Sequence, residues 1–427
     1  MKRLQTHFRR QQLMLAITAT LCTQVSFSAE ITDAELNDLR QQIAELRNQV
    51  AALQAQPVAI TSQTTDTKTL SMPQPKLSFK TKAGADLNFY GFVRADASYQ
   101  AKGASTMYNN ISAVPLEGTA EEDKQQDRFQ ATATATRFGM DFKTPTAIGD
   151  VGGKIEMDFF GGSTRDQFRI RHAYLTYANW LVGQTWSNFI APEYLPESLD
   201  AATYVGGSLQ RVPIVKYTDN ITDKTNFAVS VEDPKYNTRS DPDNEMRLPA
   251  LVGRINHKFD NGSVISGRSF VAEKKTTEDE NVSWGLGLGG KYQITPETML
   301  KADYYHVKGD GKFLFWANSG YVLDEDNQMH SNEFDVFTVG LSHSFSPKLR
   351  STIGYGYMKA DDNNEFAELS YDDTSQNKSL WQGWVNAIYK PYTPIELGVE
   401  YVYGERETFD GQNGIDNRIN MMAVYHF

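Results

Sequence analysis

The chain ends with RINMMAVYHF, from Arg418 to Phe427, and the residues of this stretch alternate in character. Successive side chains of a β-strand point to opposite faces, so every second residue shares a face. One face is wholly apolar, and the other includes charged and polar side chains. The apolar face carries Ile419, Met421, Ala423, Tyr425 and Phe427; the other carries Arg418, Asn420, Met422, Val424 and His426. Such a strand suits a sheet that separates an apolar medium from water.

Working back from this strand, the period of two recurs as far as Asp86 and predicts sixteen strands. The expected ranges are 86–101, 128–142, 150–160, 168–178, 180–186, 210–217, 224–232, 249–259, 262–273, 282–294, 298–307, 334–345, 348–361, 379–390, 394–405 and 415–427.

The segments between these strands alternate between short and long. Short connectors include Ala178-Asn179 and Ser346-Pro347, whereas long ones include 102–127, 187–209, 233–248, 308–333 and 362–378. Outer-membrane barrels have an even number of strands, short turns at one end and long loops at the other. A soluble β-sandwich has no reason to sort its loops in this way. The sequence therefore predicts an all-β fold, a 16-stranded antiparallel transmembrane β-barrel over residues 86–427.

The N-terminus carries the pattern of a secretory signal peptide. Basic residues precede an apolar run from Leu13 to about Val25, which is too short to span a bilayer, and small residues follow. We expect a signal peptide over residues 1–29, with cleavage after Ser28 or Ala29. The one cysteine, Cys22, lies inside this segment, so the exported protein is expected to hold no disulfide and no thiolate site.

Residues 30–56 show a heptad repeat and form a second predicted segment. Leu36, Ile43 and Val50 alternate with Leu39, Leu46 and Leu53 at spacings of three and four, which predicts a short coiled-coil helix ahead of the barrel. An amphipathic helix packed on its own domain is the alternative. Residues 57–85 are rich in Thr, Ser, Gln and Pro, which is typical of an extended linker.

Four motifs resemble the DcaP-like family of outer-membrane channels. They are YGFVRADASY at 90–99, EMDFFG at 156–161, FRIRHAY at 168–174 and LVGQTWS at 181–187. The resemblance covers the mature chain, since the family also carries a coiled coil before its barrel. It implies a homotrimer of 16-stranded barrels that admits dicarboxylic acids and similar small anions. The β-branched residues at Ile43 and Val50 by themselves favour two helices rather than three.

Alternation also indicates which charged side chains face the lumen, because a Lys or Arg facing lipid at mid-bilayer costs about 2–4 kcal/mol. The predicted pore-lining residues are Arg94, Asp96, Arg169, Arg171, Arg254, Arg268 and Lys301. In the fourth strand the same alternation places His172 and Tyr174 with Phe168 and Ile170, on the lipid side.

Arginine suits carboxylate solutes because its planar fork can bind both oxygens. The alternative is that these arginines pair across the wall with carboxylates and only fill it; the candidate partners are Asp96, Glu156, Asp158, Asp303, Glu396 and Glu400. The loop 187–209 either folds inward as a constriction or lies on the surface.

The sequence predicts a porin for small anionic solutes, with no enzyme activity, cofactor or metal. The net charge of -11 argues against nucleic acid as a partner. Expected partners are the outer membrane with its lipopolysaccharide, other copies of the chain, and the barrel assembly machinery, which would recognise the strand ending in Phe427. A structural or adhesive barrel and a barrel hydrolase are the alternatives. For the hydrolase, Ser342-His343-Ser344 is the one Ser/His pairing to consider, and alternation turns His343 toward lipid.

Overall fold

The computed structural model describes residues 77–427, except 83, 109–110, 148, 163–165, 235–240, 242–243 and 315–316. The predicted signal peptide, the predicted coiled coil and most of the predicted linker lie outside the described residues. No helix in the described part of the chain is long and apolar enough to span a membrane.

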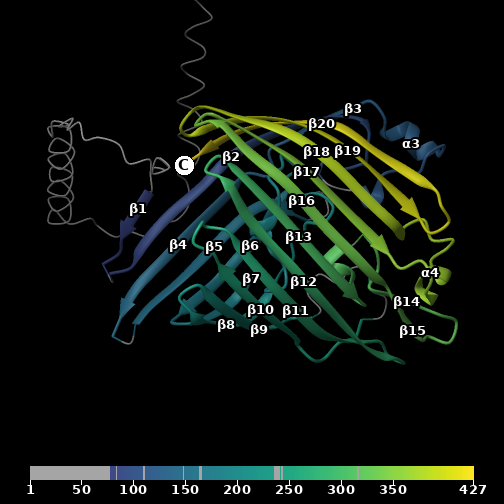
Figure 1. Cartoon of the computed structure of the whole chain (residues 1–427), viewed down its shortest axis with the longest axis horizontal. Coiled ribbons are helices and arrows are strands. Elements are labelled where there is room, and N and C mark those ends of the chain that lie inside the picture. Colours follow the sequence, from purple (N-terminus) through teal and green to yellow (C-terminus); the bar gives the residue numbers. More distant parts are fainter. Residues whose placement is uncertain are drawn as a thin grey trace, which may run out of the picture. The chain divides into compact units, whose positions relative to one another are not determined.

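Most strands of the described residues form one antiparallel sheet that closes on itself (Figure 1), and two short strands pair with each other in a separate sheet. Each barrel strand pairs with its neighbours along the chain, and closure comes from the pairing of the first barrel strand, β2, with the last, β20. The sheet has eighteen labelled strands, but these include the short β1 and two halves, β3 and β4, of one wall strand. Sixteen wall positions therefore close the barrel, which confirms the predicted strand number.

The wall strands follow the predicted ranges closely. They are β2 (Asp86–Lys102), β3 (Arg128–Thr132) continued by β4 (Arg137–Thr146), β5 (Gly149–Gly161), β6 (Gln167–Tyr177), β7 (Trp180–Trp186), β8 (Arg211–Thr222), β9 (Thr225–Glu232), β10 (Ala250–Lys258), β11 (Val264–Lys275), β12 (Glu280–Thr295), β13 (Thr298–Lys308), β16 (Glu333–Ser346), β17 (Leu349–Ala360), β18 (Asn377–Tyr392), β19 (Ile395–Thr408) and β20 (Asn413–His426).

Smaller elements lie between the wall strands and before them. They are β1 (Leu77–Lys80), η1 (Ile111–Ala113), α3 (Ala120–Gln125), η2 (Pro192–Tyr194), η3 (Gly311–Leu314), β14 (Tyr321–Leu323), β15 (Met329–Ser331) and α4 (Glu365–Leu369). The sequence did not predict them, because each is too short to show a periodicity. The strand β1 belongs to the predicted linker and pairs with β2 from Asp86 to Phe89, beyond the residues of β2 that pair with β20.

Side-chain exposure separates the two faces of the wall. On β2, Val93 is 52% exposed on the outer face, whereas Asp96 and Ser98 are buried on the inner face. On β16, His343 lies with the outward Leu341 and Phe345, as alternation predicted, and its Nδ1 is 2.8 Å from the hydroxyl of Thr298.

The strand β6 departs from strict alternation. Glu156 of β5 pairs with His172, but the next residue, Met157, pairs with Ile170, so Arg171 is the extra residue of a β-bulge. A bulge shifts all residues on its far side to the opposite face.

The bulge overturns part of the sequence prediction. His172 is buried, and its Nδ1 lies 2.9 Å from Thr185 Oγ1 inside the barrel. Leu175 and Tyr177 are exposed on the outer face, so Tyr174 and Thr176, which alternate with them, point inward. The prediction that His172 and Tyr174 face lipid is therefore wrong, whereas the inward placement of Arg171 holds.

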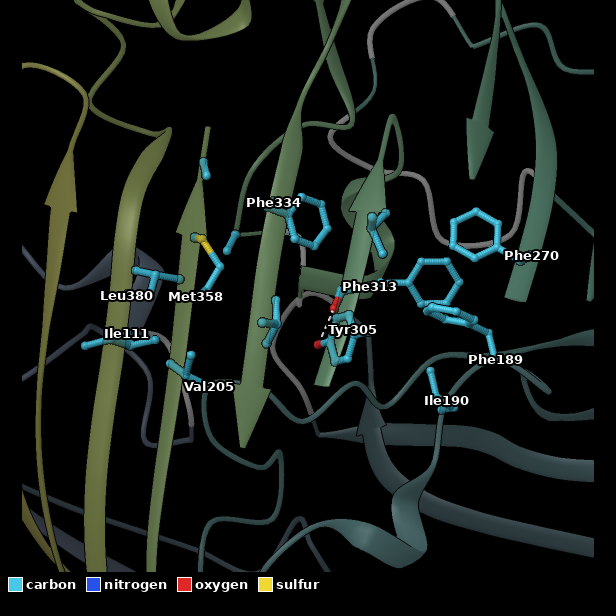
Figure 2. Packing of buried hydrophobic residues seen from close by; sticks show 14 of the residues in the cluster. Ile111, Phe189, Ile190, Val205, Phe270, Tyr305, Phe313, Phe334, Met358 and Leu380 are labelled. Atoms are coloured by element: carbon cyan, nitrogen blue, oxygen red, sulfur yellow. Dashed lines mark hydrogen bonds between the residues drawn. The ribbon is translucent and has the colours of Figure 1, made fainter. Parts of the chain in front are cut away.

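A hydrophobic cluster lies inside the barrel and packs inward loops against the inner wall (Figure 2). Phe189 and Phe313 come from two loops and lie 4.8 Å apart, ring to ring, and each is also 4.8 Å from Phe270 of β11. Further wall members come from β10 to β18, among them Val252, Tyr305, Phe334, Met358 and Leu380. Burial of this cluster stabilises the inward loops at this side of the lumen.

Candidate functional site

The segment between β7 and β8, residues 187–210, folds into the barrel, and we call it the constriction loop. Residues 188–210 contain three carboxylates and no Lys or Arg. Each carboxylate forms an ion pair with an arginine on a different part of the wall. The pairs are Glu193 with Arg254 of β10, Glu197 with Arg350 of β17 at 2.8 Å, and Asp200 with Arg418 of β20 at 3.1 Å. The alternative in which this loop lies on the surface is therefore excluded.

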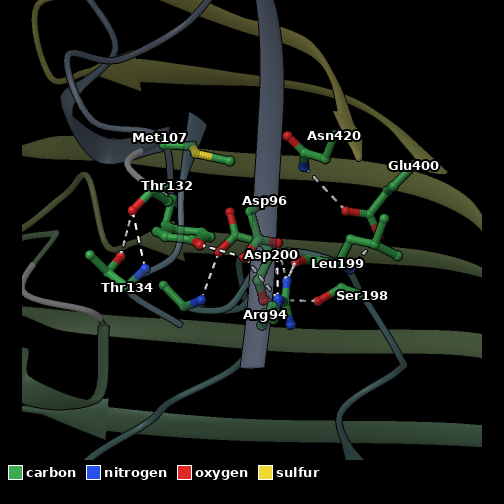
Figure 3. Close-up of polar contacts among 12 residues, drawn as sticks. Arg94, Asp96, Met107, Thr132, Thr134, Ser198, Leu199, Asp200, Glu400 and Asn420 are labelled. Atoms are coloured by element: carbon green, nitrogen blue, oxygen red, sulfur yellow. Dashed lines mark hydrogen bonds and ion pairs between the residues drawn. The ribbon is translucent and has the colours of Figure 1, made fainter. Parts of the chain in front are cut away.

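Backbone carbonyls of the constriction loop accept further hydrogen bonds from wall cations. Arg268 Nη1 donates to Phe189 O at 3.0 Å, Arg254 Nη1 to Ile190 O at 3.2 Å, and Lys301 Nζ to Leu195 O at 3.0 Å. Arg94 of β2 donates to Leu199 O and also pairs with Asp96 (Figure 3). These cations position the loop.

Close approach of the loop to the wall depends on particular small residues. The carbonyl oxygen of Val205 accepts a hydrogen bond from Thr338 Oγ1 at 3.2 Å, and its amide donates to Gln382 at 3.2 Å. A Cβ atom at Gly356 of β17 would overlap that same carbonyl oxygen. Gly206 has a φ of +90°, a conformation that glycine adopts without strain.

A second anchor lies beneath the loop at the β19 wall. Glu400 accepts hydrogen bonds from the Tyr204 hydroxyl and, at 2.9 Å, from the Leu199 amide. Asn386 and Asn420 donate to the same carboxylate, so its oxygens have protein partners on every side.

The loop between β13 and β16 also folds inward. Lys274 of β11 is buried and pairs with Asp241 at 2.7 Å and with Asp310 at 3.7 Å, while Lys312 pairs with Asp310 at 3.0 Å. Burial disfavours the charged form of Asp310, but the two lysines outweigh burial and hold its pKa below the usual value. This network of two lysines and two aspartates joins the loop between β9 and β10 to the loop between β13 and β16.

The opposite side of the lumen is formed by β4 to β8. Six cations lie on the lumen side of these strands, and we call them the basic wall: Arg137, Lys154, Arg169, Arg171, Arg211 and Lys216. Arg211, the first residue of β8, is placed there by its contact with the ring of Trp186, which the inward Arg171 also contacts. Three carboxylates share the same inner face, Asp141, Glu156 and Asp158; the exposed pair of Lys143 with Asp150 at the strand ends is balanced. The described part of this wall thus carries three more positive than negative charges.

Exposure varies on both sides. On the basic wall the side chains of Arg169, Arg137 and Lys154 are 38%, 29% and 26% exposed, whereas Arg171 is 8% exposed. Among the arginines that hold the constriction loop, Arg350 is 30% exposed, but Arg268 and Arg418 are 1% and 2% exposed. Part of the basic wall is therefore accessible from the lumen.

The seven residues predicted to line the pore all point inward, but they separate into two groups. Arg169 and Arg171 belong to the basic wall and pair with Glu156 and Asp158. The other five lie on the side of the constriction loop: Arg94, Asp96, Arg254, Arg268 and Lys301. Arg94 pairs with Asp96, and Arg268 pairs with Asp303.

Sequence reasoning missed four members of the basic wall, Arg137, Lys154, Arg211 and Lys216. Lys154 and Lys216 have inward parity on their strands and could have been found by that signal. Arg137 begins β4 after the break at Ala133–Thr136, and Arg211 is the first residue of β8, so neither has a clear strand context in the sequence.

Comparisons with known proteins agree with this architecture. Residues 20–427 match the model of the DcaP outer membrane protein family. The crystal structure of the outer membrane channel DcaP of Acinetobacter baumannii is 39% identical, with a TM-score of 0.74 over 82% of this chain and 99% of that chain.

More distant matches share the fold alone or a short segment. An anion-selective porin from Comamonas acidovorans is 10% identical, with a TM-score of 0.53 over 80% of this chain and 100% of that one. The outer membrane protein PagN of Salmonella typhimurium is 26% identical over 102 residues, which is 23% of this chain and 41% of PagN.

The family match spans nearly the whole chain, and the barrel places an apolar face outward and a charged, loop-lined lumen inward. The chain therefore belongs to the DcaP outer membrane protein family and is a channel of the Gram-negative outer membrane.

Proposed function

We propose that the protein is a diffusion channel for small anionic solutes, dicarboxylates above all, and that these solutes pass along the basic wall. The observation that carries the proposal is the surplus of three cations on the inner face of β4 to β8, opposite the constriction loop. A dicarboxylate would find both charge and geometry there, since arginine binds carboxylates through two parallel hydrogen bonds.

The other side of the lumen offers less to an anion. The hydrophobic cluster and the constriction loop cover the wall there, and the loop supplies a carboxylate to each of Arg254, Arg350 and Arg418. Arg350 also pairs with Glu396 at 3.0 Å, so its charge is more than neutralised. The cations on this side act as anchors of the loop.

Local charge is expected to outweigh the net charge of -11. At physiological salt the Debye length is about 8 Å, so carboxylates on distant loop tips are largely screened from the lumen. Two unit charges about 4 Å apart interact by about 4 kcal/mol at an effective dielectric constant near 20. A few unpaired arginines beside the solute therefore dominate the selectivity.

The reversal potential of the native channel in a KCl gradient tests this function. We expect the sign that corresponds to chloride preference, and we expect succinate to enter liposomes that contain the channel faster than an uncharged solute of similar size. Preference for potassium would contradict the proposal and would assign the selectivity to the carboxylates of the constriction loop.

We also propose that residues 30–56 form a parallel coiled coil that joins three copies of the chain, after cleavage of the signal peptide 1–29. The unbroken heptad seam from Leu36 to Leu53 and the family relationship support this assembly.

A further inference from the structure

One nitrogen of the basic wall has no hydrogen-bond partner in the described part of the chain. It is the Nη1 atom of Arg211, a side chain that is buried, with 7% of the residue exposed. Buried arginine nitrogens are normally paired, because an unpaired buried charge loses its hydration without compensation. The position of Arg211 therefore points to a ligand that is not part of the chain.

An aromatic ring holds this guanidinium in place. Arg211 and Trp186 lie opposite each other in the pairing of β7 with β8, and the Arg211 guanidinium carbon lies 4.5 Å from the centre of the indole ring. The guanidinium of Arg171 lies 5.8 Å from the same ring. Stacking on an aromatic face leaves the N–H edge of a guanidinium free to bind an anion.

The nearby carboxylates already accept hydrogen bonds from other groups, and none of the hydrogen bonds found in the described part of the chain joins them to Arg211. Both oxygens of Asp158 accept hydrogen bonds from Arg169 and Arg171. Glu156 accepts from Arg171 through one oxygen at 2.7 Å and from the Tyr90 hydroxyl through the other at 2.9 Å.

The charge of this cluster is also unbalanced. Four arginines, Arg137, Arg169, Arg171 and Arg211, surround two carboxylates, Glu156 and Asp158. Among the described residues the buried Nε atom of Arg137 likewise has no hydrogen-bond partner; it forms an ion pair with Glu156 at 3.6 Å. Two positive charges therefore remain available to a ligand.

We propose that Arg211, stacked on Trp186 beside Arg171, is a binding site for one carboxylate group of a permeating solute. This inference rests on the proposed function and specifies where along the basic wall a dicarboxylate pauses. The carboxylate would receive hydrogen bonds from Arg211, and the second carboxylate of the solute would remain free for another cation of the wall.

The test of this site is the block of single-channel chloride current by succinate. The block is measured for the native channel, for Arg211→Gln and for Arg211→Lys. Arg211→Gln removes the hydrogen bonds of the charged guanidinium to the carboxylate, so we expect its affinity for succinate to be about tenfold lower than that of the native channel. Arg211→Lys keeps the charge but not the fork, so its affinity should fall between the two. Lys224→Gln removes one charge from an exposed turn and serves as the control, with unchanged affinity.

The outcomes separate this site from the proposed function. Succinate block of Arg211→Gln at native affinity, in a channel that still prefers chloride, overturns the site and leaves the function intact. A native channel that prefers potassium overturns the function itself. Phosphate block with the same dependence on Arg211 would overturn the assignment to carboxylates in particular. Should Arg211→Gln not fold, Arg211→Lys decides: weaker block supports the site, and native block refutes it.

Discussion

Replacing Arg137, Arg169 and Arg211 together by glutamine is expected to abolish the anion preference of the channel. The change removes three cations from the inner face of β4 to β8, so the remaining cations equal the three carboxylates there in number. The carboxylates of the constriction loop, of which Glu193 is 43% exposed, then set the sign of the selectivity. We expect the reversal potential in a KCl gradient to move to zero or to the potassium side.

A matched variant separates this local effect from net charge. Lys80, Lys124 and Lys224 have side chains that are 80%, 68% and 52% exposed. Their joint replacement by glutamine changes the net charge by the same amount outside the basic wall, so the native reversal potential should persist. An equal shift in both triple variants would show that overall charge, and not the basic wall, controls selectivity.

Gly356→Val is expected to raise the conductance by displacing the constriction loop. A side chain at this position overlaps the carbonyl oxygen of Val205. Overpacking of this kind costs about 1–3 kcal/mol. The two hydrogen bonds of Val205, to Thr338 and Gln382, contribute about 0.5–1.5 kcal/mol each. The wall strand is held by its neighbours on both sides, so the loop is the part that moves.

The control for this variant is Gly253→Val on β10. A Cβ atom there has its nearest heavy atom at 3.6 Å, an ordinary contact. Its single-channel conductance should equal that of the native protein. If Gly356→Val also conducts like the native protein, the contact at Val205 does not hold the constriction.

The barrel itself could be read from the sequence because each wall strand alternates and each connector has a typical length. The prediction is wrong at His172 and Tyr174, where one extra residue, Arg171, forms a bulge. The outward apolar residues do change parity across the bulge, from Phe168 and Ile170 to Leu175 and Tyr177, but the sequence does not show at which residue the change occurs.

The candidate site could be predicted only in part. Alternation identified inward arginines correctly but could not tell which of them the constriction loop would occupy. The choice of arginine depends on which wall positions Glu193, Glu197 and Asp200 contact once the loop has folded across the lumen. These contacts join residues that are far apart in the sequence. Arg94, Arg254 and Arg268 are consequently anchors, whereas Arg211 became visible as a candidate only through its unpartnered nitrogen.

The most direct test of the solute path is the rate at which charged thiol reagents modify Tyr174→Cys. The tyrosine lies inward on β6 between His172 and Thr176, and the exported chain is expected to contain no other cysteine. Thr338→Cys, at a buried position beneath the constriction loop on β16, is the matched control.

If anions pass along the basic wall, an anionic methanethiosulfonate should modify Tyr174→Cys about tenfold faster than a cationic one and reduce the current, since about 1.4 kcal/mol of local potential corresponds to that ratio. Thr338→Cys should react slowly with both reagents. Faster reaction of Tyr174→Cys with the cationic reagent, or rapid modification of Thr338→Cys with Tyr174→Cys untouched, would contradict the account.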